Sequence, residues 1–104
     1  MKKIITALGN PLLNEKISKE KEFKILTKDI QYQDGIFEIL EKEEKIDFLI
    51  LGEILLGQNK IEDLIDKIIE KNKKIKIIVI LQDKKEKLEN ILYIKGVKKI
   101  YYNN

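Results

Sequence analysis

Short apolar runs separated by charged segments organise this chain, and the central run occupies residues 46–51. One Asp interrupts this run and Gly52 stops it. Its apolar residues stand at successive positions, which is typical of a parallel strand that is covered on both faces. Residues 74–81 have the same character. Because open α/β sheets bind ligands at the carboxyl ends of their strands, we expect any functional site to lie just after Gly52.

Strands and amphipathic helices alternate along the rest of the sequence. Three more strands are predicted at residues 3–8, 23–27 and 97–102. Four helices are predicted, one that begins at Asn10-Pro11 and three at residues 35–44, 61–72 and 84–94. Pro is favourable at the first helical position, and Gly96 is expected to end the last helix. The alternation predicts right-handed crossovers and a parallel sheet, in a single domain that spans residues 1–104.

The amino-acid composition limits the catalytic and metal-binding chemistry that the chain can perform. The 104 residues are 43% hydrophobic, which is enough for one core. The chain has no Cys and no His, and all 21 of its basic residues are Lys. It therefore lacks a thiolate, the commonest general base, and the side chain that most often binds phosphate in a bidentate manner. We expect no enzyme activity, no cofactor and no metal site.

The charge pattern also limits the partners. The net charge is +3, but Lys alternates with Glu and Asp almost everywhere, as on solvated helix faces. A nucleic-acid partner is therefore not expected. No apolar run approaches the roughly 18 residues that a membrane-spanning helix needs, so membrane insertion is not expected. The short apolar stretch near Met1 is interpreted as the first strand, and the predicted location is the cytoplasm.

Three segments of the sequence resemble the receiver domain of two-component response regulators, the CheY-like family. Residues 4–11 match its first strand and turn, residues 46–57 its third strand and following loop, and residues 96–101 the approach to its fifth strand. The resemblance implies a three-layer, flavodoxin-like α/β fold. Its five-stranded parallel sheet would have the order 2-1-3-4-5, with a site over strands 1, 3 and 5.

The residues that carry receiver chemistry are absent from the matching positions. The acidic pair that holds magnesium falls on Leu8 and Gly9, and the phosphoacceptor Asp falls on Gly52. The hydroxyl residue after strand 4 falls on Gln82, and the Lys after strand 5 falls on Asn103. Magnesium needs carboxylate oxygens, and an aspartyl phosphate needs an Asp. The resemblance therefore implies a pseudo-receiver with a degenerate phosphorylation site.

Three polar residues near these positions are candidates for a remaining role. Glu53 either replaces the acceptor or mimics a phosphorylated Asp, or it is a solvated loop residue. Asp83 either lines the site or caps the helix at residues 84–94, and capping is the favoured interpretation. Asn10 is a candidate ligand residue. Asp29 is explained by turn chemistry.

Receivers end in a fifth helix beside strand 5, and the given sequence stops soon after Tyr102. One face of strands 4 and 5 would then expose apolar residues, which monomeric proteins avoid. Either the domain is excised from a longer protein or a partner, including a second copy, covers this face. The candidate interaction residues are Ile100, Tyr101 and Tyr102. If strand 5 is the interaction edge, charged substitutions at Ile100 or Tyr102 are expected to disturb partner binding or self-association more than folding.

The loop at residues 29–36 and the degenerate site are also similar to the amino-terminal receiver-like domain of MinD/ParA-type, CpaE-like pilus-assembly ATPases. This chain has no phosphate-binding loop, so any ATPase would lie outside it. The leading hypothesis is a non-catalytic pseudo-receiver that acts through protein–protein contact in a signalling or ATPase-linked protein. The alternative is a small-molecule or nucleotide-binding module that uses the crevice at Gly9, Asn10, Gly52 and Gln82. Both glycines either admit a ligand or simply make tight turns.

Overall fold

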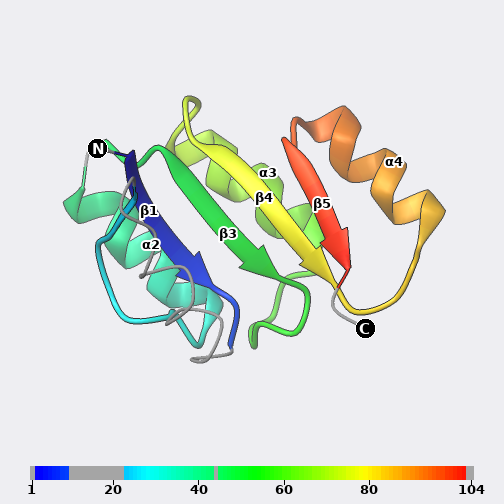
Figure 1. The fold of residues 1–104 in the computed structure, drawn as a ribbon, viewed down its shortest axis with the longest axis horizontal. Coiled ribbons are helices and arrows are strands. Elements are labelled where there is room, and N and C mark those ends of the chain that lie inside the picture. Colours follow the sequence, from blue (N-terminus) through cyan, green and yellow to red (C-terminus); the bar gives the residue numbers. More distant parts are fainter. Residues whose placement is uncertain (1, 10–22, 44, 103–104) are drawn as a thin grey trace.

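The computed structural model describes residues 2–9, 23–43 and 45–102. Within them the chain forms five strands and three helices (Figure 1). The elements are β1 (Lys2–Ala7), β2 (Phe23–Ile25), α2 (Gln33–Lys42), β3 (Phe48–Gly52), α3 (Ile61–Lys71), β4 (Lys76–Leu81), α4 (Glu86–Lys95) and β5 (Lys99–Tyr102). The helix predicted to begin at Asn10-Pro11 lies outside the described residues. No helix in the described part of the chain is long and apolar enough to cross a membrane.

The five strands form one parallel sheet in the order β2-β1-β3-β4-β5, as the resemblance implied. Strand β3 is central, because Leu49 pairs with Ile5 of β1 on one side and with Ile77 of β4 on the other. The carboxyl ends of neighbouring parallel strands lie at the same edge of a sheet. The pairing therefore brings the segments that follow β1, β3 and β4 together, although they are far apart in the sequence.

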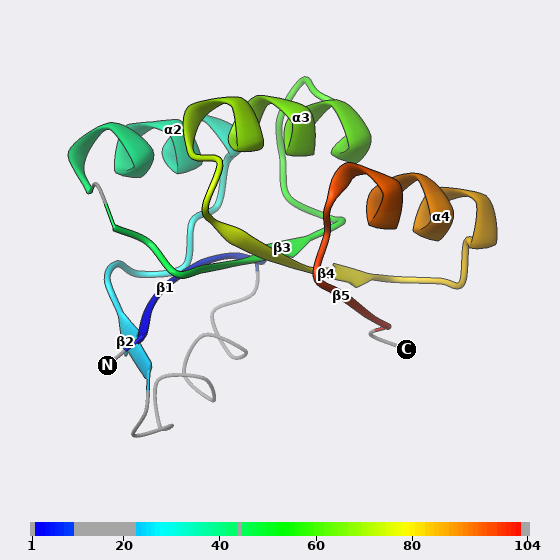
Figure 2. The same ribbon diagram turned by 90° about the horizontal axis from the view of Figure 1, so that it is seen from above.

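The core lies between the sheet and the described helices, all three of which cover the same face (Figure 2). On this face Leu49, Leu51 and Val79 are fully buried. They belong to the same cluster as Leu64 and Ile68 of α3. Leu64 and Ile68 stand four residues apart, so they lie one above the other on one side of that helix. Helix α3 is thus held by the apolar stripe that the sequence predicted.

The opposite face of the sheet is less covered. The side chains of Phe48 and Ile50 on β3, and of Ile78 and Ile80 on β4, are only partly buried. The prediction that both strands are covered on both faces is therefore wrong for this face. In β3 and β4, apolar residues that point to the helices alternate with apolar residues that point to this partly covered face. The second set does not form a second core.

Two helix starts differ from the prediction. Helix α2 begins at Gln33, two residues before the predicted start. Helix α4 begins at Glu86 with Lys85 at the N-cap position, so Asp83 is not the cap and is exposed instead. The end of α4 was predicted correctly, because Gly96 adopts φ +109 after the last turn.

Candidate functional site

The predicted site residues that fall within the described chain gather at the carboxyl edge of the sheet. Leu8 and Gly9 follow β1, Gly52 ends β3, and Gln82 follows β4. Asn10 and Asn103 lie outside the described residues. Within the described ranges, no three Asp, Glu, His or Cys residues are placed to hold a metal ion.

Gly52 is required by a close approach between two backbones. A β-carbon at this position would lie 2.9 Å from the carbonyl oxygen of Leu8 and 3.1 Å from its Cα. Contacts this short force the backbone to shift. Neighbouring main chain therefore leaves no room for a side chain at the end of β3 in this arrangement.

Gly9 is explained by its conformation. Its φ of +69 lies in the left-handed region, which residues with a β-carbon rarely adopt. Gly9 turns the chain at the end of β1, and Gly52 lets β3 approach Leu8. Both glycines thus have a sufficient role within the fold.

Asp29, in the loop between β2 and α2, closes the end of β1. Its Oδ1 accepts hydrogen bonds from the Thr6 hydroxyl at 2.8 Å and from the Leu8 N–H at 2.9 Å. Its Oδ2 accepts a bond from the Gln31 side chain at 2.9 Å. From the sequence alone, Asp29 was interpreted as a turn residue. The structure shows in addition that Asp29 satisfies polar groups of β1 more than twenty residues away.

Glu53 is the carboxylate at the centre of this edge, and it is not a solvated loop residue. Its side chain is 20% exposed. One oxygen accepts a hydrogen bond from the Gln82 N–H at 2.9 Å, and the other is paired with the Lys85 ammonium. Burial raises the pKa of Glu53, but these two contacts outweigh burial and hold the pKa below its usual value. Glu53 therefore ties the end of β3 to the loop that leads into α4.

Lys85 was not identified from the sequence. It lies in a run of lysines and acids in which no residue is distinguished by its neighbours. Its partner Glu53 is 32 positions away, and the fold alone brings the two together. The sequence offered one signal for this pair: Lys85 follows β4, which is a neighbour of β3 in the sheet.

A second polar contact fixes the loop between β3 and α3. Gln33 is 5% exposed, and its amide exchanges hydrogen bonds with the backbone N–H and C=O of Asn59. Gln33 also receives a bond from the Asn59 side chain at 3.1 Å. Of the three apolar residues in this loop, only Leu55 is buried, whereas Ile54 and Leu56 are exposed.

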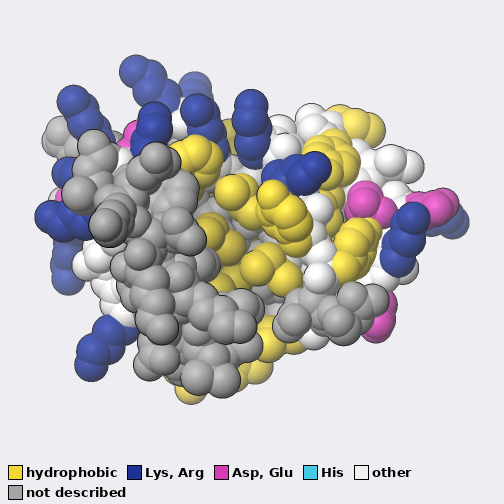
Figure 3. Space-filling view, in the orientation of Figure 1, with side chains coloured by type: hydrophobic (Ala, Val, Ile, Leu, Met, Phe, Trp, Pro, Cys, Tyr) yellow, Lys and Arg dark blue, Asp and Glu magenta, His cyan; other side chains and the backbone are white. Residues whose placement is uncertain are grey.

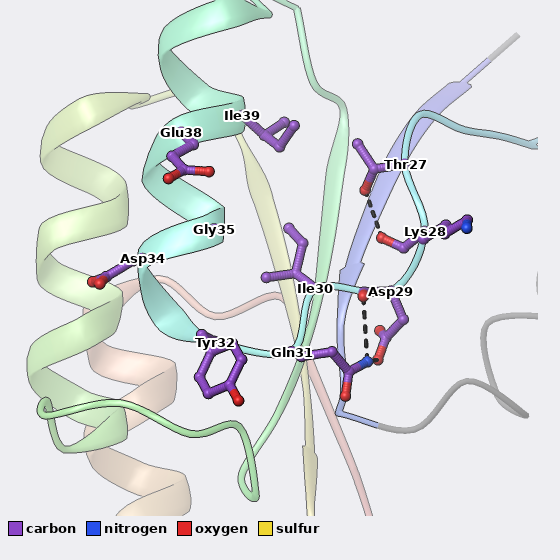
Figure 4. A pocket seen from close by; sticks show the side chains of 10 residues that line it. All are labelled: Thr27, Lys28, Asp29, Ile30, Gln31, Tyr32, Asp34, Gly35, Glu38 and Ile39. Carbon is purple, nitrogen blue, oxygen red and sulfur yellow. Dashed lines mark hydrogen bonds between the residues drawn. The ribbon is translucent and has the colours of Figure 1, made fainter.

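A hollow of about 480 Å³ lies beside this edge, between the β2–α2 loop and helix α2 (Figure 4). Ile30 and Ile39 belong to its wall, and the hydrogen-bonded side chains of Asp29 and Gln31 lie at its border. Neither Gly52 nor Gln82 lines it. The hollow is thus distinct from the crevice that the ligand-binding alternative would use.

The three candidate interaction residues on β5 separate into two groups. Ile100 is 7% exposed and belongs to the core, and Tyr102 packs against that core from the same face. The buried Tyr102 hydroxyl has no hydrogen-bond partner among the described residues. Burial and the nearby Glu89 carboxylate raise its pKa to about 12. Of the three, only Tyr101 is exposed, at 53%. Because Ile100 and Tyr102 pack against the core, charge at either position is expected to disturb folding as well as any binding.

The fold is that of response-regulator receiver domains. No protein-family model matches the sequence, and no curated protein matches it. Solved structures match closely in shape. A response regulator from Burkholderia pseudomallei, determined with a phosphorylated aspartic acid, superposes with a TM-score of 0.80 at 13% identity over 99% of this chain. This chain spans 60% of the length of that protein.

Two further solved structures give the same result. A CheY-like receiver domain protein from Methanospirillum hungatei has a TM-score of 0.77 at 11% identity, covering 99% of this chain and 82% of its own. A pilus assembly-related protein from Burkholderia pseudomallei has a TM-score of 0.78 at 13% identity, covering 98% of this chain and 78% of its own. At these identities the likeness establishes the fold.

Proposed function

We propose that this chain is a non-catalytic pseudo-receiver, a domain that keeps the receiver fold and acts through contact with another protein. The observation that carries the proposal is the contact between Gly52 and Leu8. The resemblance matches Gly52 to the phosphoacceptor position of a receiver, and main chain of Leu8 leaves no room for a side chain on Gly52. A protein with this arrangement has no carboxylate at that position to attack phosphorus.

Glu53 supports the proposal, because its carboxylate is already engaged. An acceptor must present a free oxygen to the phosphorus atom, and both oxygens of Glu53 are bonded within the domain. The lowered pKa also makes the carboxylate a weaker nucleophile. In the proposed role Glu53 and Lys85 form a permanent pair of opposite charges. This pair holds the loop between β4 and α4 in one position without any modification.

The proteins of similar fold suggest the setting. Several of them are response regulators, and one is related to pilus assembly. We infer a regulatory role of the same kind, in a signalling protein or in one linked to an ATPase. The alternative of a ligand-binding module loses its main motivation, because the fold itself accounts for Gly9 and Gly52.

The test is incubation with acetyl phosphate and Mg²⁺, followed by the intact mass of the protein. The response regulator from Burkholderia pseudomallei serves as the positive control in the same reaction. The proposal predicts no phosphoryl adduct on this chain. A stoichiometric, hydroxylamine-sensitive adduct that disappears in Glu53→Gln would assign the acceptor role to Glu53 and overturn the proposal.

A further inference from the structure

One face of the sheet carries an apolar patch that none of the described helices covers. We call it the open face, and it consists of Phe48, Ile50, Ile78, Ile80 and Tyr101. The strand register places these residues on the same side, because Ile50 pairs with Ile78, and Ile80 pairs with Tyr101. Figure 3 shows apolar side chains gathered at the middle of this face, and Figure 2 shows α2, α3 and α4 on the other side of the sheet.

The charged strand residues on this face all have the same sign. They are Lys2, Lys76 and Lys99, and the described strands place no acidic residue on this side. The Lys76 ammonium lies 5.5 Å from the centre of the Phe48 ring, and the Lys99 ammonium lies 5.9 Å from that of Tyr101. Lysines therefore lie beside the aromatic residues of the open face. Figure 3 shows lysines along the upper margin of the patch and acidic side chains at its right-hand margin.

We propose that the open face binds an amphipathic α-helix of a protein partner, with acidic side chains flanking the apolar stripe of that helix. Parallel sheets are normally covered on both faces, and helices are the elements that pack on them. The apolar stripe would cover Ile50, Ile78 and Ile80. The acidic residues would pair with Lys76 and Lys99. This inference rests on the proposed function, and it specifies the chemistry of the partner.

The same charges argue against a second copy as the occupant. A two-fold contact through the open face would place identical surfaces against each other. Because every charged strand residue of the open face is a lysine, Lys76 and Lys99 of one copy would meet no acidic strand residue of the other, and bringing these like charges together is costly. The whole chain also carries a net charge of +3. The surface therefore complements an acidic partner better than it complements itself.

The test uses two fluorescent synthetic helices of about 14 residues, which differ only in charge. Both carry Leu at i, i+3, i+4 and i+7, flanked by Glu in one peptide and by Lys in the other. Binding to the 104-residue chain is measured by fluorescence anisotropy at low salt. We expect the Glu peptide to bind about twofold to thirtyfold more tightly than the Lys peptide, as two exposed ion pairs would give.

Charge reversal makes the test specific for this face. In the double variant Lys76→Glu and Lys99→Glu, the preference should invert, so that the Lys peptide binds more tightly. The matched control is Lys42→Glu with Lys71→Glu, which makes the same change of charge on helices of the opposite face. The control should keep the original preference for the Glu peptide. Both double variants are checked for folding by thermal melting.

Three outcomes would overturn the inference: equal binding of both peptides, a preference that the Lys76/Lys99 reversal leaves unchanged, or a dimer that Tyr101→Lys dissociates. Binding to anionic lipid vesicles in place of the peptides would overturn it as well. None of these outcomes depends on whether the chain accepts a phosphoryl group. Failure of the partner assignment is therefore distinguishable from failure of the pseudo-receiver proposal, which the phosphodonor reaction tests.

Discussion

The carbonyl oxygen of Leu8 lies 2.9 Å from the point where a β-carbon on Gly52 would be. Strands β1 and β3 thus meet at their carboxyl ends more closely than a side chain between them would allow. In an open α/β fold this is the edge at which ligands usually bind. Here the edge is closed by main chain at Gly52 and by the Glu53–Lys85 pair beside it.

Gly52→Ala should lower the free energy of unfolding by about 1–3 kcal/mol, since the new methyl group must displace backbone atoms. Chemical denaturation of Gly52→Ala and of the parent protein under the same conditions measures the difference. Equal stability of Gly52→Ala and the parent would contradict the close approach.

Glu53→Gln should destabilise the fold by about 0.5–1.5 kcal/mol at neutral pH, because Gln keeps the bond to the Gln82 N–H but loses the ion pair. The pKa of Glu53 in the folded state lies below its ordinary value of 4.5. Its contribution to stability is therefore present above that value and is lost as the pH falls through the folded pKa. The difference between parent and variant should shrink on acidification, as urea denaturation at several pH values will measure.

The control for this variant is Glu86→Gln. Glu86 lies 4.0 Å from Lys84 in a pair that is largely exposed on both sides, so its loss should change stability by less than about 0.5 kcal/mol. A Glu53→Gln effect no larger than that of Glu86→Gln, or one that grows on acidification, would refute the role assigned to the Glu53–Lys85 pair.

Leu49→Ala should cost about 2–5 kcal/mol, because Leu49 is fully buried at the centre of the sheet. Ile54→Ala, at a side chain that is 51% exposed, should cost much less. The two melting temperatures are compared under identical conditions. Similar losses at both positions would show that Leu49 does not occupy the core.

Two charge substitutions on β5 separate the core from the open face. Ile100→Asp places a carboxylate in the core and should largely unfold the domain, since an unpaired buried charge is strongly unfavourable. Tyr101→Asp, one residue further on, points to the opposite face and should leave the fold intact. Circular dichroism spectra reveal the difference. A folded Ile100→Asp variant would mean that β5 is placed in the wrong register.

Much of the fold could be predicted from the sequence, because apolar spacing reports local structure directly. The run at residues 46–51 indicated the central strand, and the stripe at Leu64 and Ile68 indicated α3. The start of α4 was misplaced because Asp83 looked like a cap, whereas the helix begins three residues later without a side-chain cap. Capping residues are common in turns as well, so their presence alone does not fix a helix boundary.

The site was predicted less well, because its contacts join residues that are distant in the sequence. The resemblance placed Gly52 correctly at the end of β3, and Glu53 was identified as the nearby carboxylate. That Glu53 is paired with Lys85, and that Asp29 bonds to Thr6, follows only from the folded chain. Likewise, Ile100 and Tyr101 point to opposite faces of the sheet, so Ile100 is buried and Tyr101 is exposed. The sequence did not indicate this difference, because both side chains are largely apolar.

The most direct test of the pseudo-receiver proposal is an NMR titration of the amide spectrum with beryllofluoride and Mg²⁺, which together mimic a carboxylate-bound phosphoryl group. The amide signals of Gly9, Gly52 and Glu53 report on the carboxyl edge of the sheet. If the edge is closed as described, these signals should not move beyond the shifts that Mg²⁺ alone produces. Saturable shifts confined to these residues would show an open acceptor site and contradict the proposal.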